Sequence, residues 1–352
     1  MSKTLLVMAG GTGGHIFPAL AVAETMRTAG WRVVWLGHPD GMEARLVPQH
    51  GYEMVWVKFG ALRGKGLLRK LLLPFNLLRG FWQAFKAIRQ VQPNVVLGMG
   101  GYITFPGGMM ASLLGKPLVV HEQNSVAGLA NRVLAGVADR VLSGFPEVLG
   151  KGEWVGNPVR REVTELALPA ERLAGREGPL HVLVIGGSLG AAALNAMVPQ
   201  GIAQLPAEAR PQIVHQAGEK HLDTLKANYA AVEVQAHCVA FIEDMAGAYD
   251  WADVVICRAG ALTVAELAAA GVASVLVPFP HAVDDHQTAN ANFLVSAGGA
   301  VLLPQNELTP EVVAQVCQTS RTQLLEMAVQ ARSQAKPDAT SDVATICAEI
   351  AQ

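Results

Sequence analysis

The stretch that decides the fold runs from Val254 to Asn290 and reads VVICRAGALTVAELAAAGVASVLVPFPHAVDDHQTAN. Its first four residues form an apolar run typical of a strand buried on both faces. The glycine turn at Gly260 then leads into an alanine-rich segment that favours a helix. A second apolar run follows from Ser274 to Pro278. This order predicts a βαβ unit in a parallel sheet, with its ligand edge where strands end and helices begin.

Several polar side chains fall near this predicted edge, and their chemistry suits a nucleotide sugar: Arg258, Thr263, Glu266, Gln287 and Asn290. The arginine would offer a cationic fork to a diphosphate, and the helix start near Ala261 would offer backbone N–H groups. The carboxylate could accept hydrogen bonds from two ribose hydroxyls, and the two amides would share one helix face toward sugar hydroxyls. The alternative is an ordinary surface ion pair with solvated amides.

Length and composition bound the class of protein. A chain of 352 residues exceeds what one core usually fills, so two domains are expected. Hydrophobic content of 51% with 36 glycines indicates a globular, turn-rich chain. The four cysteines form no CxxC pair, which favours a reducing cytoplasm over a disulfide framework or a zinc site. We expect neither a signal peptide nor a membrane-spanning segment.

Charge is distributed unequally along the chain. Residues 1–160 hold 17 Lys and Arg against 8 Asp and Glu, a balance of +9, and the remainder holds 10 against 21, a balance of −11. This asymmetry predicts an anionic partner for the first half only. Nucleic acid is not expected, because the basic residues carry no nucleic-acid-binding motif.

The N-terminus combines a predicted strand over residues 4–9, a glycine-rich turn and a predicted helix over residues 16–28. His15 ends the turn, where the positive end of the helix dipole favours the neutral imidazole that can act as a base. One alternative is that His15 merely caps the turn. Another is a dinucleotide site in which Asp40 grips a ribose, although the glycine spacing is not GxGxxG.

Further turns are expected at the same edge of the first sheet. Gly98-Met99-Gly100-Gly101-Tyr102 follows one predicted strand, and His121-Glu122-Gln123-Asn124 follows another. Residues 156–160 (GNPVR) are typical of a linker. Beyond it, Gly186-Gly187-Ser188-Leu189-Gly190 repeats the pattern of Gly10–Gly14, and with the helix after it predicts a second phosphate-binding turn.

No Asp or Glu occurs from Met54 through His121, whereas nine Lys or Arg do. Leucines and aromatic residues recur there at helical spacing, which predicts an amphipathic helix interrupted at Pro74 and a second helix after it. The alternative is that these apolar residues are core. An anionic membrane surface explains the missing acids better, and the residues expected to face it are Leu68, Arg69, Lys70, Leu72, Phe75, Arg79, Phe81 and Trp82.

Seven motifs in order carry a family resemblance: GGTGGH at Gly10, GMGGY at Gly98, HEQN at His121, GNPVR at Gly156, GGS at Gly186, CRAGALTVAE at Cys257 and DDHQTANA at Asp284. With them the chain resembles the GT-B glycosyltransferases, specifically the lipid-linked N-acetylglucosaminyl transferases of bacterial peptidoglycan synthesis. The resemblance implies an α/β protein of two Rossmann-like, doubly wound domains facing across a cleft. Their expected bounds are 1–160 for the acceptor and membrane-facing domain and 161–352 for the donor domain, with a helix at about 338–350 that crosses back.

The resemblance also implies an activity. GlcNAc would pass from UDP-GlcNAc to the MurNAc 4-hydroxyl of lipid I, with inversion, to form lipid II. His15 or Glu122 would be the catalytic base. The implied substrate-binding residues are Thr12, Gly13, Gly14, Tyr102, Asn124, Arg160, Gly187, Ser188, Ile242, Arg258, Ala261, Leu262, Thr263, Val264, Ala265, Glu266, Gln287 and Asn290.

The implied setting is the cytoplasmic face of the inner membrane, with the anionic leaflet and other cell-wall synthesis proteins as partners. The alternatives are a UDP-GlcNAc 2-epimerase, which shares the architecture and the donor, and a non-catalytic sugar-nucleotide binding protein. No Asp-x-Asp pair occurs in the chain, so we expect no metal and no cofactor.

Overall fold

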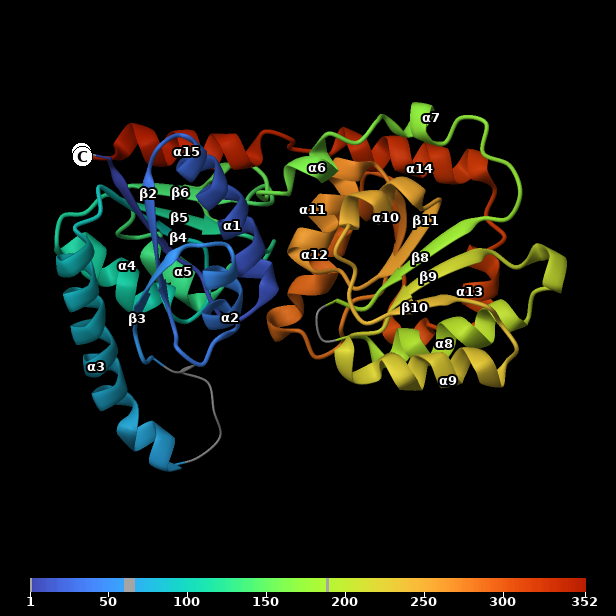
Figure 1. Cartoon of the computed structure of the whole chain (residues 1–352), viewed down its shortest axis with the longest axis horizontal. Helices are drawn as coiled ribbons and strands as arrows, with labels where there is room; N and C mark the ends of the chain where they lie inside the picture. Colours follow the sequence, from blue (N-terminus) through green and yellow to red (C-terminus); the bar gives the residue numbers. More distant parts are fainter. Residues whose placement is uncertain (1, 60–66, 188–189) are drawn as a thin grey trace. The chain divides into compact units, whose positions relative to one another are not determined.

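The computed structural model describes residues 2–59, 67–187 and 190–352, with the backbone alone described for residues 67–73 and Val283. The chain divides into two compact units. The first holds Met1–Arg160 and Pro337–Gln352, and the second holds Arg161–Lys336. Each unit is a parallel sheet with helices on both faces, so the predicted fold class is confirmed (Figure 1).

The first unit is built on a parallel sheet of seven described strands in the order β3-β2-β1-β4-β5-β6-β7. Their inner residues are buried on both faces, which is why they are apolar runs and not alternating patterns. The bounds are β1 Thr4–Met8, β2 Arg32–Gly37, β3 Glu53–Trp56, β4 Val95–Gly98, β5 Leu118–Glu122, β6 Arg140–Ser143 and β7 Glu153–Trp154.

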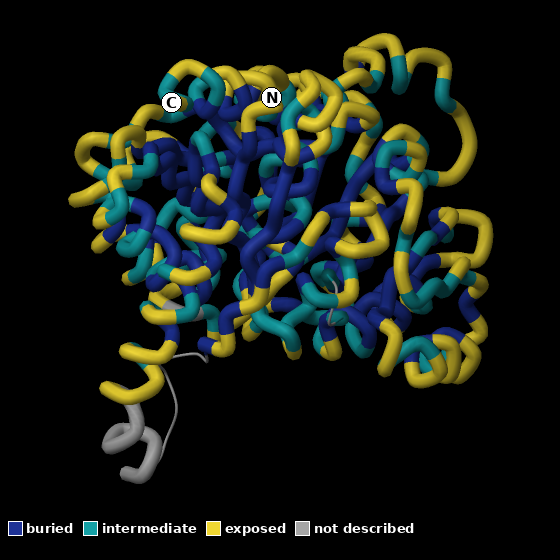
Figure 2. Tube along the Cα trace, turned by 60° about the vertical axis from the view of Figure 1, so that its left-hand side comes forward, coloured by how far each residue is buried: buried dark blue, intermediate teal, exposed yellow. Residues whose placement is uncertain are grey.

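Helices cover both faces of this first sheet. One face packs against α1 (Gly13–Thr28), α2 (Met42–Gln49) and α15 (Ala339–Ile350), so the last helix of the chain belongs to the first core. The other packs against α3 (Leu67–Val91), α4 (Thr104–Leu113) and α5 (Leu129–Leu134). Figure 2 shows the strands buried beneath helices whose outer faces are exposed.

The second unit has a parallel sheet with the order β10-β9-β8-β11-β12-β13. The strands are β8 His181–Ile185, β9 Gln212–Gln216, β10 His237–Val239, β11 Val254–Cys257, β12 Ala273–Leu276 and β13 Ala300–Leu302. One face is covered by α8 (Ala192–Ala203), α9 (Leu222–Ala231) and α13 (Pro310–Val316). Across the sheet lie α10 (Met245–Trp251) and α11 (Ala261–Ala270) (Figure 1). The unit also contains α12 (His286–Val295) and α14 (Arg321–Ser333). It begins with the short helices α6 (Arg161–Thr164) and α7 (Pro169–Arg172).

Three sequence expectations need correction. The helix predicted from residue 16 begins at Gly13, so His15 lies in its first turn. β5 extends to Glu122, so His121 and Glu122 belong to the strand and do not follow it. α3 is one helix that runs through Pro74 and is not interrupted there. A proline removes one backbone hydrogen bond, at a cost of roughly 3 kcal/mol, and the strong helix formers on both sides of Pro74 offset it.

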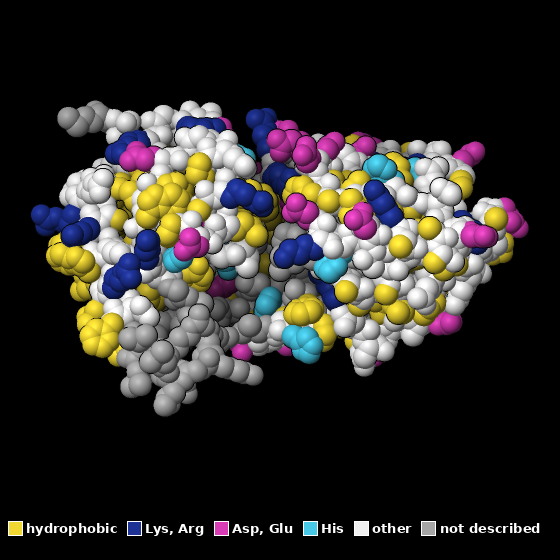
Figure 3. Space-filling model, turned by 60° about the horizontal axis from the view of Figure 1, so that its bottom comes forward, with side chains coloured by type: hydrophobic (Ala, Val, Ile, Leu, Met, Phe, Trp, Pro, Cys, Tyr) yellow, Lys and Arg dark blue, Asp and Glu magenta, His cyan; other side chains and the backbone are white. Residues whose placement is uncertain are grey.

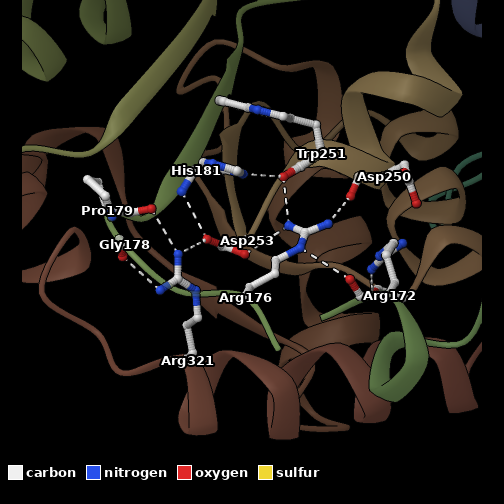
Figure 4. Close-up of polar contacts among 10 residues, drawn as sticks. Arg172, Arg176, Gly178, Pro179, His181, Asp250, Trp251, Asp253 and Arg321 are labelled. Atoms are coloured by element: carbon white, nitrogen blue, oxygen red, sulfur yellow. Dashed lines mark hydrogen bonds and ion pairs between the residues drawn. The ribbon is translucent and has the colours of Figure 1, made fainter. Parts of the chain in front are cut away.

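A buried ion network fastens the strand-start edge of the second sheet, opposite its ligand edge (Figure 4). Asp253 precedes β11 and is almost completely buried. Its Oδ1 lies 2.9 Å from Arg176 Nη1 and its Oδ2 lies 3.0 Å from Arg321 Nη2. The backbone N–H of His181 donates to the same carboxylate, at 2.9 Å. The network therefore anchors the start of β8, the start of β11 and α14 to one another.

Among residues 2–59, 67–187 and 190–352, no helix is long and apolar enough to cross a membrane.

Candidate functional site

The order of strands marks one ligand edge in each unit. In the first sheet the chain runs outward from β1 in one direction to β3, then returns beside β1 at β4. In the second it runs from β8 out to β10 and returns beside β8 at β11. Ligands of open parallel sheets bind beyond the carboxyl ends of the strands where the order reverses. The turns after β1 and β4, and those after β8 and β11, are therefore the candidate ligand sites.

In the second unit α11 begins at Ala261, as predicted, directly after β11. Gly260 is its N-cap and makes no side-chain capping bond, so the first-turn N–H groups of Ala261, Leu262 and Thr263 are directed to the ligand edge. The helix continues through Val264 and Ala265 to Glu266, which is nearly buried. Glu266 Oε2 accepts a hydrogen bond from the Tyr249 hydroxyl of α10, at 3.1 Å.

Arg258 lies at the ligand edge, but its contacts differ from the expected diphosphate fork. Nη1 donates to the carbonyl oxygens of Val277 and Pro278, at 3.1 and 3.0 Å, and Nη2 donates to Gln305 Oε1 at 2.6 Å. Burial lowers the pKa of its guanidinium. β11 pairs with β12 up to Cys257 and Leu276, so Arg258 and Val277, the next residues, lie side by side. The hydrogen bonds of Arg258 therefore hold the loop after β12 in place.

The two amides of α12 have different surroundings. Gln287 is half-buried and its Oε1 accepts the backbone N–H of Phe279, at 2.8 Å. Asn290 is fully buried, and its Nδ2 donates to the Ala259 carbonyl, at 3.2 Å. Asn290 therefore packs on the turn before α11, and its contact with a sugar alongside Gln287 stays a prediction.

The turn after β8 is held by the neighbouring strand β9. Gln216 Oε1 accepts the backbone N–H of Gly187 at 3.2 Å, and its Nε2 donates to the Gly187 carbonyl at 2.9 Å. A Cβ on Gly190 would lie 2.0 Å from the Ala217 carbonyl oxygen, so the turn requires glycine there. The prediction for Ser188 falls outside the described residues. Ile242, one of the expected substrate-binding residues, is half-buried before α10.

In the first unit the turn after β1 leads into α1. Thr12 is the N-cap, without a side-chain capping bond, and Gly13 and Gly14 open the helix. The His15 ring meets the turns after β4 and β5: its Nδ1 lies 2.8 Å from Gln123 Oε1, and a Cβ on Gly100 would lie 2.6 Å from the same nitrogen.

A buried carboxylate lies behind this first glycine turn. Glu43, fully buried on α2, accepts the backbone N–H of Gly11 at 3.1 Å and that of His38 at 3.0 Å. A Cβ on Gly10, Gly37 or Gly41 would come within 3 Å of Glu43. These glycines are needed to accommodate the carboxylate. Asp40, the ribose ligand of the dinucleotide alternative, has a side chain that is 88% exposed.

Glu122 makes its hydrogen bonds away from His15. Its Oε1 accepts the backbone N–H of Asn124, at 2.9 Å. Its Oε2 accepts the backbone N–H of Gly128 at 3.0 Å and the Asn131 amide at 2.8 Å. Successive strand residues point to opposite sides, so Glu122 organises the loop before α5 while its two neighbours face His15.

The remaining expected residues of the first unit lie around the same edge. Tyr102 is half-buried, and its ring would meet a Cβ on Gly11 at 3.7 Å. Asn124 is half-buried just beyond β5. The Arg160 guanidinium lies 5.6 Å from the centre of the Phe17 ring of α1. Thr12, His15, Tyr102 and Asn124 thus surround the ends of β1, β4 and β5.

Sequence reasoning assigned no role to five residues that shape these edges: Glu43, Gly100, His121, Gln123 and Tyr249. For His121 and Gln123 a signal existed. Residues two apart on a strand share a side, so a strand through Glu122 places His121 and Gln123 together. Glu43 lies 32 residues from Gly11, and Tyr249 lies 17 residues from Glu266, so no local pattern identifies these two contacts.

Several of the side chains predicted to face a membrane are exposed on α3. Phe75, Leu78 and Trp82 of α3 are 71%, 67% and 57% exposed, with Arg79 exposed among them. Phe81 is half-buried, and its ring lies edge-on to Phe105 of α4, 5.7 Å away. The side chains of Leu68, Arg69, Lys70 and Leu72 are outside the described part of the structure.

Apolar side chains are also exposed on the neighbouring helices: Leu113 of α4, and Leu129 and Val133 of α5. Yellow apolar and dark blue basic side chains lie beside one another on the first unit, at the left of Figure 3. Within the described ranges, no group of three or more His, Cys, Asp and Glu side chains is arranged to hold a metal ion.

Two family models match most of the chain. Residues 5–143 match the N-terminal domain of glycosyltransferase family 28, and residues 181–344 match its C-terminal domain. The two matches cover the ligand edges of both sheets.

Curated relatives are similar over the full length. A protein of Dechloromonas aromatica is 76% identical over all of both chains, and one of Azoarcus is 70% identical over 99% of each. Both are named UDP-N-acetylglucosamine–N-acetylmuramyl-(pentapeptide) pyrophosphoryl-undecaprenol N-acetylglucosamine transferase. The crystal structure of Acinetobacter baumannii MurG is 43% identical, with a TM-score of 0.85 over 99% of both chains.

Proposed function

The chain belongs to glycosyltransferase family 28, and on this premise we propose that it transfers GlcNAc from UDP-GlcNAc to lipid I, forming lipid II. One observation carries the proposal: the 76% identity to the transferase of Dechloromonas aromatica extends over the whole of both chains. Donor and acceptor halves are therefore both retained. The relatives do not favour the epimerase or a non-catalytic binding protein.

The second unit binds the donor. The uncapped N-terminus of α11 directs backbone N–H groups to the diphosphate, and the helix dipole favours its negative charge. Glu266, one turn into α11, accepts hydrogen bonds from the ribose, and backbone groups near Ile242 recognise the uracil. Gln287 contacts the sugar. Arg258 contributes by bracing the loop after β12, since its fork is bonded within the protein.

The first unit activates the acceptor. His15 Nε2 takes the proton of the MurNAc 4-hydroxyl as that oxygen attacks the anomeric carbon. The bond from this carbon to the diphosphate breaks, and its electron pair leaves with UDP, which inverts the anomeric centre. His15 suits the base better than Glu122, because both oxygens of Glu122 accept hydrogen bonds inside its own loop.

The lipid acceptor requires a surface that meets a membrane. We propose that α3 supplies it: three large apolar side chains are exposed there, and Arg79, Lys86 and Arg89 lie on the same helix, which carries no acid. Apolar insertion combined with attraction to anionic lipid is the usual basis of reversible membrane binding. The protein then acts at the cytoplasmic face of the inner membrane, peripherally, with other cell-wall synthesis proteins as possible neighbours.

Product analysis tests the activity. The protein is incubated with UDP-GlcNAc, with and without a lipid I analogue. We expect UDP and the disaccharide lipid only when the analogue is present. UDP-ManNAc formed without the analogue would indicate an epimerase, and no turnover with bound nucleotide would indicate a binding protein.

The base is tested in the same assay. His15→Ala should lower kcat by roughly 10²–10⁴, the range for a lost general base, while UDP affinity is unchanged. Near-normal turnover of this variant would remove His15 from the mechanism. Glu122→Gln serves as the comparison, and a loss of similar size without structural change would return the role to Glu122.

A further inference from the structure

A chain of hydrogen bonds runs from a backbone carbonyl to the ring of His15. His121 Nε2 lies 2.9 Å from the Gly156 carbonyl oxygen, and His121 Nδ1 lies 2.9 Å from Gln123 Nε2. Gln123 Nε2 also lies 3.0 Å from the His121 carbonyl oxygen. Gln123 Oε1 then lies 2.8 Å from His15 Nδ1. These hydrogen bonds thus link the side chains of His121, Gln123 and His15, in that order, starting at the Gly156 carbonyl oxygen.

Two carbonyl groups determine where the protons lie, because a carbonyl oxygen only accepts hydrogen bonds. The carbonyl of Gly156 requires a proton on His121 Nε2, so the neutral ring has a bare Nδ1. The carbonyl of His121 requires the amide nitrogen of Gln123 on its side, which directs Oε1 toward His15. Since Oε1 is also an acceptor, His15 must carry a proton on Nδ1. Neutral His15 therefore has its lone pair on Nε2.

The surroundings hold this arrangement in place. His121 and Gln123 are 0% and 1% exposed, so water does not compete for their hydrogen bonds. Burial lowers the pKa of His121 to about 4, which keeps its ring neutral near pH 7. Gly100 has φ +97, and a Cβ there would lie 2.6 Å from His15 Nδ1 and 3.1 Å from Gln123 Oε1. The glycine allows its backbone to pack directly against the bond between the two side chains.

We propose that Gln123 and His121 are positioning residues that hold His15 as its Nδ1–H tautomer and so present Nε2 as the proton acceptor. This inference rests on the proposed role of His15 as the base. During the reaction Nε2 gains the proton of the acceptor hydroxyl, and Nδ1 keeps its own. Gln123 Oε1 accepts the same hydrogen bond before and after this step, so no partner has to reorient when the ring becomes charged.

The charged groups of the neighbouring elements are directed elsewhere. Glu43 of α2 bonds to backbone N–H groups, Glu122 of β5 to the loop before α5, and Arg160 lies over Phe17. The neutral amide of Gln123 is thus the group that reaches Nδ1 directly.

The tautomer can be measured without any variant. The full-length protein is labelled with ¹⁵N-histidine, and long-range ¹H–¹⁵N spectra are recorded above the titration range of the ring, with His15→Gln used to assign the His15 signals. We expect a protonated Nδ1 and a bare Nε2 for His15, and the reverse pattern for His121. A protonated Nε2 on neutral His15 would overturn the inference, whatever the activity of the enzyme.

Variants test the consequence for catalysis. Gln123→Met keeps the length of the side chain but removes its hydrogen bonds to His15 and His121. We expect kcat to fall about 10- to 100-fold with little change in KM, by analogy with the loss of residues that orient metal ligands. Gln123→Glu places a carboxylate beside Nδ1 and stabilises the charged ring, so the acidic limb of the pH–rate profile should move to higher pH. Gln204→Met, an exposed change in the second unit, is the control and should leave the profile unchanged.

The outcomes separate this inference from the proposed function. Full activity in His15→Ala would remove the base itself and with it the inference. The positioning role alone would be overturned by a different set of results. In that case His15→Ala is inactive, the pH–rate profile of Gln123→Glu is unshifted, and folded Gln123→Met keeps the wild-type kcat.

Discussion

The Tyr249 hydroxyl donates a hydrogen bond to Glu266 Oε2 at 3.1 Å, and both side chains are nearly buried. One carboxylate oxygen of the proposed ribose ligand is therefore oriented from α10 before any nucleotide arrives. Preorganisation of this kind reduces the entropy lost on binding.

We predict that Glu266→Gln weakens UDP binding by about 1.5–3 kcal/mol, the range for losing a charge-assisted hydrogen bond. TDP lacks the ribose 2′-hydroxyl and should lose less. Tyr249→Phe keeps the carboxylate but not its orienting bond, so its effect should be smaller. Isothermal titration calorimetry with UDP and TDP measures these differences. Unchanged UDP affinity in Glu266→Gln would exclude a ribose contact.

The exposed apolar side chains of α3 should be needed for membrane binding. A full-length variant with Phe75, Leu78 and Trp82 changed to Ser should lose roughly tenfold or more in affinity for vesicles of anionic lipid, because each inserted side chain contributes up to about 2 kcal/mol. Leu168→Ser with Val301→Ser, two exposed apolar residues of the second unit, is the matched control. Sedimentation with vesicles measures binding; equal pelleting of both variants would contradict the assignment.

The basic residues of α3 should also contribute to membrane binding, independently of its apolar side chains. Arg79→Glu with Lys86→Glu should weaken binding to anionic vesicles, since each basic residue near such a surface contributes about 1 kcal/mol. Added salt should weaken the wild type in the same direction. UDP affinity serves as the check on folding. If the wild type binds neutral vesicles as well as anionic ones, the basic residues have no such role.

Removing the buried carboxylate of Asp253 should destabilise the second unit. Asp253→Ala leaves Arg176 and Arg321 close together without their counter-charge, at a cost of about 3 kcal/mol. The control is Glu165→Ala, which removes the partner of Arg161 in an exposed pair with N···O 2.6 Å; such pairs are screened by water and should matter little. Urea unfolding compares the two, and equal midpoints would show that the network adds no stability.

Acid should destabilise the second unit through His215. Burial lowers the pKa of this ring to about 3, and its neighbours are Tyr229 Oη at 2.9 Å and Asn195 Oδ1 at 3.1 Å. In the unfolded chain the pKa is about 6.5. Above that pH neither state is protonated and stability is unaffected. Below it the unfolded state alone binds the proton, so the free energy of unfolding falls by about 1.4 kcal/mol per pH unit until the folded pKa is reached.

The pH dependence of urea unfolding between pH 7 and 5 tests this. His215→Gln cannot titrate, so its slope should be smaller than that of the wild type by about one proton. His237→Gln, an exposed change on β10, should keep the wild-type slope. Identical slopes in the wild type and His215→Gln would rule out this histidine as the source of acid sensitivity.

Local patterns predicted the elements well and the contacts of their side chains less well. The run at Val254–Cys257 and the helix from Ala261 are as expected, because apolar periodicity and alanine content act over a few residues. The bonds of Arg258 to Val277 and of Asn290 to Ala259 depend on which strands pair and which helix face packs. Neither is visible in a short stretch of sequence.

The alternation of side chains along a strand could have predicted part of the site. Extending the predicted strand by two residues, to Glu122, places His121 and Gln123 on one side and Glu122 on the other. This separates the pair proposed to position His15 from the carboxylate that binds the loop before α5. The need for glycine at Gly10, Gly37 and Gly41 could not be derived in this way. It arises from Glu43, which the fold brings beneath all three.

The glycine turns of the two units share a sequence pattern, but a carboxylate supports the first turn and a neutral amide supports the second. Gly11 N–H is held by the carboxylate of Glu43, whereas Gly187 N–H is held by the neutral amide of Gln216. A phosphate group at the second turn would therefore meet no carboxylate just behind the backbone, which supports the proposal that the second unit binds the nucleotide.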